Sequence, residues 1–251
     1  MNKISGTLLN RRTIRKYTSA PVDENLLNDL LGMACRASTT GNMQVYSIII
    51  TRDPAMKREL APCHFNQKMV TEAPVLLTFC ADFNRFSKWC LGRNASPGYD
   101  NFLSFFTAAI DALLVAQTFC IAAEAAGLGI CYLGTTTYTA GKIIEILKLP
   151  SGVVPVTTVT AGWPAEEPDQ VDRLPLEAVT HAETYKDYSS ADIGRYYSDK
   201  ENRSDSAQFV SENNKETLAQ VFTDVRYKKG DNIHFSKALL DVLKKQGFMN
   251  Q

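Results

Sequence analysis

The longest periodic stretch of the chain is NFLSFFTAAIDALLVAQTFCIAAEAA, residues 101–126. Apolar side chains recur in it at helical spacing on most sides, and Gly127 follows it in the position typical of a helix C-terminus. The stretch is long enough to span a bilayer, but Asp111, Gln117 and Glu124 interrupt it and flanking charges are missing from its ends. The pattern predicts a central core helix covered on more than one face, with a subunit interface as a natural second partner.

Other elements follow from shorter patterns on both sides of this helix. Apolar runs at 45–51, 75–81 and 153–161 predict buried strands, because they are rich in β-branched residues. Amphipathic spacing and capping residues predict helices at 23–36, 54–61, 64–70, 142–147 and 235–248, with Asp23 and Asp53 as N-caps. Residues 82–100 are interpreted as a surface loop or broken helix. Residues 183–217 are polar with little periodicity, which predicts an extended or mobile segment.

Composition restricts the class of protein. The chain has 251 residues, 45% of them apolar, and zero formal net charge. These values fit one large domain, or one and a half, and favour neither nucleic acid nor a membrane as partner. The N-terminus has no signal-peptide pattern, so we expect a cytoplasmic protein. Six scattered cysteines predict buried reduced thiols, and three distant histidines predict no structural metal.

A basic stretch, RRTIRKY, occupies residues 11–17. Arg12 and Arg15 are three positions apart, so on a helix or tight turn they would share a face, with the hydroxyl of Thr13 beside them. Two guanidinium groups and a hydroxyl can hold a phosphate monoester through paired, charged donors. The spacing alone favours a different interpretation, the solvated basic end of a helix. A second polar stretch, residues 37–42, is either a ligand-binding turn or only a turn.

Four quoted stretches together resemble one family, the FMN-dependent nitroreductases and flavin reductases. They are RRTIRKYTSAPVDENLLNDLLGMACRASTTGNMQ (11–44), CADFNR (80–85), GLGICYLG (127–134) and KLPSGVVPVTTVTAGWPAEEPDQVDRLPLEAV (148–179). Their order and spacing are similar to those of the larger, NADPH-preferring, oxygen-insensitive nitroreductase branch. The resemblance covers about residues 5–185.

The resemblance implies an α+β fold, with a central, mostly antiparallel sheet wrapped by helices. It implies an FMN-binding core at 1–182 and a C-terminal extension at 183–251 that packs on the core or on a partner subunit and is not an independent domain. It also implies a homodimer with noncovalent FMN at the interface. The residues that match cofactor contacts by position are Arg11, Arg12, Thr13, Arg15, Ser38, Thr39, Asn42, Gln67, Leu133, Gly134, Thr135 and Arg173.

The implied roles differ along that series. The opening cations and Thr13 would contact the phosphate and ribityl chain, with Arg173 on the phosphate side. Gln67 would hydrogen-bond the ring system, and residues 133–135 would lie beneath it. The chain departs from the family pattern at Val171, where a lysine is usual, and an acid follows at Asp172. The cations for a 2′-phosphate cannot be aligned in the tail, which leaves NADH or NADPH open.

The implied activity is that of an FMN-dependent NAD(P)H oxidoreductase. It would reduce nitroaromatics, quinones or flavins by ping-pong hydride transfer, and the sequence nominates no acid or base as a catalytic residue. Two alternatives remain open. One is an FMN enzyme of the same fold with a specific dehydrogenase or dehalogenase reaction, and the other is a non-catalytic flavin-binding protein.

Overall fold

The structure is a computed structural model that describes residues 3–250, apart from the side chain of Lys3. The described chain forms two compact units. The first comprises residues 3–169 together with 235–250, and the second comprises residues 170–234.

The first unit is built on one antiparallel sheet of four strands in the order β1-β2-β4-β3. The strands are β1 Tyr46–Thr51, β2 Val75–Asp82, β3 Gly129–Leu133 and β4 Val153–Gly162. The register of β2 against β4 shifts between Phe79 and Cys80, where the partners are Thr157 and Pro155. A bulge suits this position because proline has no N–H to donate to the ladder. The predicted α+β class is confirmed.

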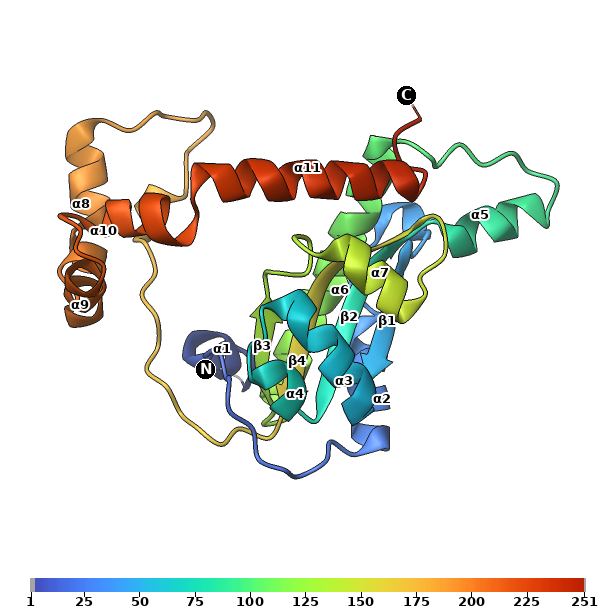
Figure 1. The fold of residues 1–251 in the computed structure, drawn as a ribbon, viewed down its shortest axis with the longest axis horizontal. Helices are drawn as coiled ribbons and strands as arrows, with labels where there is room; N and C mark the ends of the chain where they lie inside the picture. The colour runs from blue at the N-terminus through green and yellow to red at the C-terminus, as the bar shows by residue number, and fades with distance from the viewer. Residues whose placement is uncertain (1–2, 251) are drawn as a thin grey trace. The chain divides into compact units, whose positions relative to one another are not determined.

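Helices cover both faces of this sheet (Figure 1). On one face, α6 Phe102–Ala125 packs across all four strands and against α2 Glu24–Ala34. Phe119 of α6 and Phe79 of β2 meet there with ring centroids 6.2 Å apart. The predicted core helix is therefore confirmed. By length and composition alone α6 could also cross a membrane, but half of its apolar window is buried in the protein.

The opposite face carries α3 Pro54–Leu60, α4 Met69–Glu72 and α7 Ala140–Leu147. Their apolar residues form a second core with Leu76 of β2 and with Cys131 and Leu133 of β3. Successive residues of a strand point to opposite faces, so Leu76 faces this core while its neighbour Leu77 faces α6. Continuous apolar strands are thus explained by helices on both sides.

Local signals account for several helix starts. The carboxylate of Asp23 accepts the N–H of Leu26 at 3.0 Å, and that of Asp53 accepts the N–H of Met56 at 2.8 Å. Both caps confirm the predicted starts of α2 and α3. Three more helices contribute to this unit: α1 Lys3–Asn10, α5 Asn84–Leu91 and the part of α11 Lys229–Lys245 that follows His234.

The predicted helix at 64–70 is wrong. A 3₁₀ turn, Ala61–His64, ends in two left-handed residues, Phe65 and Asn66, each with φ of +54°. The N–H of Asn66 then donates to the carbonyl of Ala61 at 2.9 Å, which closes the turn. Helix α4 begins only at Met69.

The second unit corrects another expectation, because residues 183–217 are largely helical. It contains α8 Ser190–Glu201, α9 Ser204–Glu212, α10 Leu218–Gln220 and a π-helical turn Val221–Arg226. Reciprocal capping boxes begin α8 at Ser189 and α10 at Thr217. These helices bury few apolar residues, so their hydrophobic periodicity is weak.

Candidate functional site

The basic stretch 11–17 is extended rather than helical. Thr13 forms a parallel bridge with Ile130 of β3, and the N–H of Ile14 donates to the carbonyl of Ile130 at 3.0 Å. Residues three apart in an extended chain point to opposite sides, so Arg12 and Arg15 do not share a face. Both helical interpretations of the stretch are therefore wrong. The close approach requires Gly129, because a Cβ there would lie 2.6 Å from the Cβ of Ile14.

Arg11 and Arg12 line a cavity of about 590 Å³ at the C-terminal end of α6. The Nε of Arg11 lies 3.5 Å from Oε2 of Glu124, a carboxylate of α6. A guanidinium nitrogen of Arg12 pairs with Glu167. Both arginines of this cavity are thus held by carboxylates from distant parts of the chain.

Two buried polar atoms of this cavity make no hydrogen bond within residues 3–250. They are Nε of Arg12 and Oε1 of Glu124. Burial raises the pKa of Glu124, an effect that Arg11 opposes. An arginine N–H can only donate, and leaving it buried without an acceptor is unfavourable. The cavity therefore suits a ligand that brings an acceptor oxygen to Arg12.

Glu166 organises the backbone of the basic stretch. Its carboxylate accepts the N–H of Arg15 at 2.8 Å and that of Lys16 at 3.1 Å. The backbone N–H of Arg15 is the main reason that the pKa of Glu166 is lowered. Glu166 and Glu167 contribute to the site without any signal in the sequence, because no local pattern shows that they return to residues 12–16.

Arg15 and Gln67 line a second cavity, together with Lys16, Lys68, Met69 and Glu72. The Nε2 of Gln67 donates to the carbonyl of His64 at 3.0 Å. The fold thus brings together two predicted contact residues that lie far apart in the sequence. Arg15 comes from the extended basic stretch, and Gln67 from the loop that precedes α4.

The loop with Gln67 is joined to the segment that follows β3. Nδ1 of buried His64 lies 2.9 Å from Oγ1 of Thr135, and burial lowers the pKa of His64 to about 4. The hydroxyl of Thr139 donates to the carbonyl of Cys63 at 2.7 Å. Of the three residues expected beneath the ring, Leu133 and Thr135 are buried and Gly134 is exposed.

The polar turn with Ser38, Thr39 and Asn42 is held by α6. Asp111 of this helix is fully buried, and its carboxylate accepts the N–H of Thr40 at 2.9 Å and that of Val45 at 3.4 Å. Ser38 and Asn42 are exposed, and Asn42 has a left-handed backbone with φ of +56°. This turn can present hydroxyls and an amide to a ligand.

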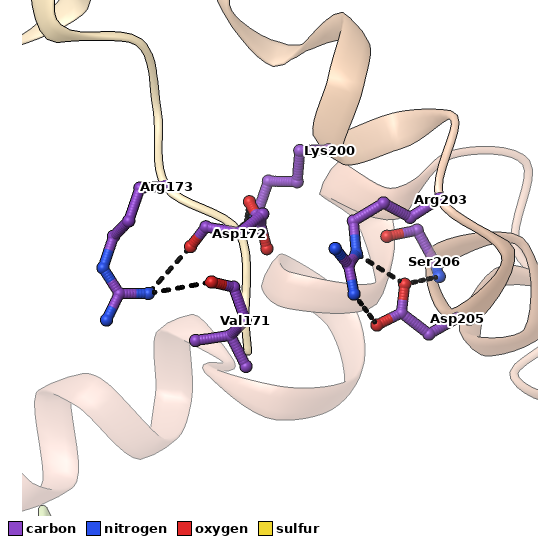
Figure 2. A network of polar contacts seen from close by, with 7 residues as sticks. All are labelled: Val171, Asp172, Arg173, Lys200, Arg203, Asp205 and Ser206. Atoms are coloured by element: carbon purple, nitrogen blue, oxygen red, sulfur yellow. Dashed lines mark hydrogen bonds and ion pairs between the residues drawn. The ribbon is translucent and has the colours of Figure 1, made fainter. Parts of the chain in front are cut away.

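Arg173 belongs to the second unit, where its guanidinium donates to main-chain carbonyls of Asp172 at 2.8 Å and Val171 at 3.5 Å (Figure 2). Lys200 pairs with the carboxylate of Asp172 at 2.8 Å. Arg203 pairs with Asp205 through two nitrogens, at 2.9 and 3.0 Å. Lys200 and Arg203, two cations of this unit, are thus already paired with acids.

Comparison with known proteins identifies the class. Residues 8–163 match the model of the Nitroreductase family, so the chain belongs to this family. It is 38% identical over 187 residues to a protein of Bacillus subtilis (strain 168) named FMN reductase (NADPH), covering 74% of this chain and 75% of the relative. It is 34% identical over 189 residues to an oxygen-insensitive NADPH nitroreductase of Salmonella typhimurium, covering 75% and 77%.

A solved structure extends the likeness over almost the whole chain. A crystal structure from Bacteroides fragilis NCTC 9343 is 60% identical and superposes with a TM-score of 0.97, covering 98% of this chain and 100% of that one. The predicted family and branch are confirmed, and so is assignment to the oxidoreductases. The α+β fold, with its antiparallel sheet, is that of the family.

Proposed function

We propose that the protein is an FMN-dependent NAD(P)H oxidoreductase that reduces nitroaromatics, quinones or flavins. The observation that carries the proposal is the placement of Arg12 and Arg15 on opposite sides of one extended stretch. Arg12 faces a cavity with a buried, unsatisfied donor, and Arg15 lines a second cavity with Gln67. The names of the two relatives, a reductase of FMN and a nitroreductase, support the same chemistry.

The residues present fit FMN. Arg11, Arg12 and Thr13 would hold the phosphate, because two guanidinium groups and a hydroxyl match its charge and acceptors. Gln67 would donate to the ring. Arg15 lines the same cavity as Gln67, so we assign it to the ring instead of to the phosphate and ribityl chain that the resemblance implies. Gly134 and Thr135 follow β3 beside the Gln67 loop and would lie beneath the ring, with Leu133 behind them. We assign Arg173 to the phosphate side and Ser38, Thr39 and Asn42 to the flavin edge.

Bound FMN would supply the redox chemistry, accepting a hydride from NAD(P)H and passing two electrons to the second substrate. The protein's residues would bind and orient. Arg15 and Gln67 would place donors at the polar edge of the ring, where negative charge develops on reduction. Because Gly134 is exposed and has no side chain, flat molecules can approach closely. No acid or base is assigned, so we name no catalytic residue.

We further propose a homodimer in which a second copy covers α6. One face of this helix remains apolar and exposed, with residues at helical spacing: Phe102, Leu103, Phe106, Ile110, Leu113 and Leu114. Such a face on an otherwise packed core helix favours a protein interface. The turn with Ser38 and Asn42 is anchored on the same helix by Asp111 and would reach the cofactor at that interface.

The remaining proposals concern organisation. We propose that residues 1–182 form the FMN-binding core. Residues 183–251 would be an extension on that core or on the partner, and the enzyme would be cytoplasmic. A non-catalytic flavin-binding protein is the second candidate, favoured by the carboxylates on Arg11 and Arg12 and by Val171. A protein whose bound flavin is not bleached by either nucleotide would support it. A specific dehydrogenase or dehalogenase would fail to reduce a broad panel of nitroaromatics and quinones.

Fluorescence titration with FMN tests the cofactor site. Arg12→Ala and Arg15→Ala should each weaken FMN binding by about 1.5–3 kcal/mol, the range for hydrogen bonds to charged groups. That loss corresponds to a roughly 10- to 150-fold rise in Kd. Arg58→Ala, at an exposed position of α3, is the matched control and should bind as the wild type does. Unchanged affinity in both test variants would contradict the assignment.

A further inference from the structure

Three aromatic rings from separate segments meet beside the Gln67 loop. Tyr138 and Phe235 stack with centroids 4.4 Å apart and planes 9° from parallel. The ring of Phe65 lies 6.4 Å from that of Tyr138 and 6.3 Å from that of Phe235. We call Phe65, Tyr138 and Phe235 the aromatic wall.

Phe65 is unusual within this wall. The residue is 55% exposed, so burial alone does not account for a large aromatic residue at this position. Its backbone is left-handed with φ of +54°, a conformation that a residue with a bulky side chain disfavours. A strained backbone that presents an exposed ring points to a role in binding rather than in folding.

The wall is tied to the residues proposed to contact the flavin ring. Phe65 lies between His64, which bonds Thr135, and Gln67, whose amide bonds the carbonyl of His64. Tyr138 follows Thr135 by three residues, and its N–H donates to the carbonyl of Thr135 at 3.1 Å. Both rings therefore stand on the two short segments that carry Gln67 and Gly134.

We propose that the aromatic wall binds flat aromatic electron acceptors by stacking, which makes it a specificity determinant for the second substrate. This inference rests on the proposed function. Aromatic rings attract one another in offset or tilted arrangements beyond the effect of apolar area alone. The parallel ring of Phe235 holds Tyr138 in one plane, and exposed Phe65 offers the accessible surface. The wall would favour fused aromatic acceptors over saturated molecules of similar size.

A purely structural role makes a different prediction. If the rings only anchor the start of the Phe235 segment, truncating them lowers stability and changes the binding of all apolar ligands equally. Stacking instead predicts a loss confined to aromatic ligands. Two uncharged probes distinguish the structural role from the stacking role. The first, 2-naphthol, is flat and aromatic, and the second, decahydro-2-naphthol, is its saturated counterpart.

The test is calorimetric binding of both alcohols to the FMN-loaded full-length protein. The variants are Phe65→Leu and Tyr138→Leu, which keep apolar bulk but remove the ring, and leucine at position 65 meets the same backbone strain. Each should weaken 2-naphthol binding about 2- to 12-fold and leave decahydro-2-naphthol unchanged. Trp89→Leu removes another exposed aromatic residue, on α5 outside the wall, and should alter neither affinity.

Flavin content is measured first, so the two proposals fail in different ways. Wild-type protein that takes up no FMN contradicts the proposed function, and the proposed role of the aromatic wall is contradicted with it. The stacking role of the aromatic wall alone is contradicted if flavin-loaded protein binds both alcohols with equal affinity. It is also contradicted if the two variants lose affinity for both alcohols equally. If Phe65→Leu does not fold, Tyr138→Leu and Phe235→Leu provide the test, through the ratio of their affinities for 2-naphthol and decahydro-2-naphthol.

Discussion

The imidazole Nδ1 of His64 lies 2.9 Å from the hydroxyl oxygen of Thr135, and both side chains are buried. This contact joins the loop before α4 to the segment after β3. It thereby fixes Gln67, which we assign to the polar edge of the flavin ring, relative to Gly134, which we assign to the space beneath that ring. Burial lowers the pKa of His64 to about 4, so the histidine is neutral at neutral pH and no charge is buried in this contact.

The low pKa of His64 predicts a pH dependence of stability. Its ordinary value is 6.5, so between pH 6.5 and about 4 the unfolded chain binds a proton that the folded chain does not. The free energy of unfolding therefore keeps its full value above pH 6.5. As the pH falls below 6.5 towards about 4, it decreases by up to about 3 kcal/mol. Urea unfolding should therefore show a steeper loss in wild type than in His64→Gln between about pH 7 and pH 4.5. Parallel curves would contradict the assignment.

Asp111 should hold the polar turn of residues 38–42. Asp111→Ala leaves the N–H groups of Thr40 and Val45 without their acceptor and should lower the free energy of unfolding by about 2–4 kcal/mol. Asp111→Asn keeps one acceptor oxygen and should lose clearly less. Denaturant titration gives both values, and FMN titration of the folded variants shows whether the turn contacts the cofactor. Equal stability of the two variants would contradict this role.

Glu167 should compete with a phosphate for Arg12. The pair is exposed on the glutamate side, so its free energy is small. Glu167→Gln removes the competing charge and should lower the Kd for FMN about 2- to 5-fold. Asp169→Asn removes an exposed charge nearby in the sequence and serves as control. Weaker FMN binding in Glu167→Gln would show that the carboxylate supports the site instead.

A charge placed on the exposed apolar face of α6 should dissociate the proposed dimer. Leu113→Lys places a charge at the centre of that face and should shift the mass in solution from about twice 27.8 kDa to 27.8 kDa. Sedimentation or light scattering measures this, with Trp89→Lys on α5 as the control. A wild-type protein that is already monomeric would contradict the proposed interface.

Much of the first unit could be predicted from local patterns. Asp23 and Asp53 cap helices through contacts three residues away, and the strands at 75–81 and 153–161 are apolar because both their faces are covered. The extended form of residues 11–17 could not be predicted, because it depends on Ile130 and Gly129 of β3. Long-range pairing of this kind leaves no periodicity in the stretch itself.

The residues proposed for the candidate site can be nominated from the sequence, but their arrangement in space cannot. The spacing of Arg12 and Arg15 predicts that they act together, whereas the structure separates them into two cavities. The carboxylates of Glu124 and Glu167 could not be assigned to the arginines, because each comes from a distant segment. The left-handed backbone of Phe65 could not be predicted, because the residues around it fit a helix at 64–70.

The proposed function requires that this chain binds FMN and reduces it with a nicotinamide nucleotide. The most direct test is a visible absorption spectrum of the purified protein after incubation with FMN and removal of excess, followed by anaerobic NADPH and, separately, NADH. We expect flavin bands that bleach on addition of at least one nucleotide. A colourless protein, or flavin bands that neither nucleotide bleaches, would contradict it.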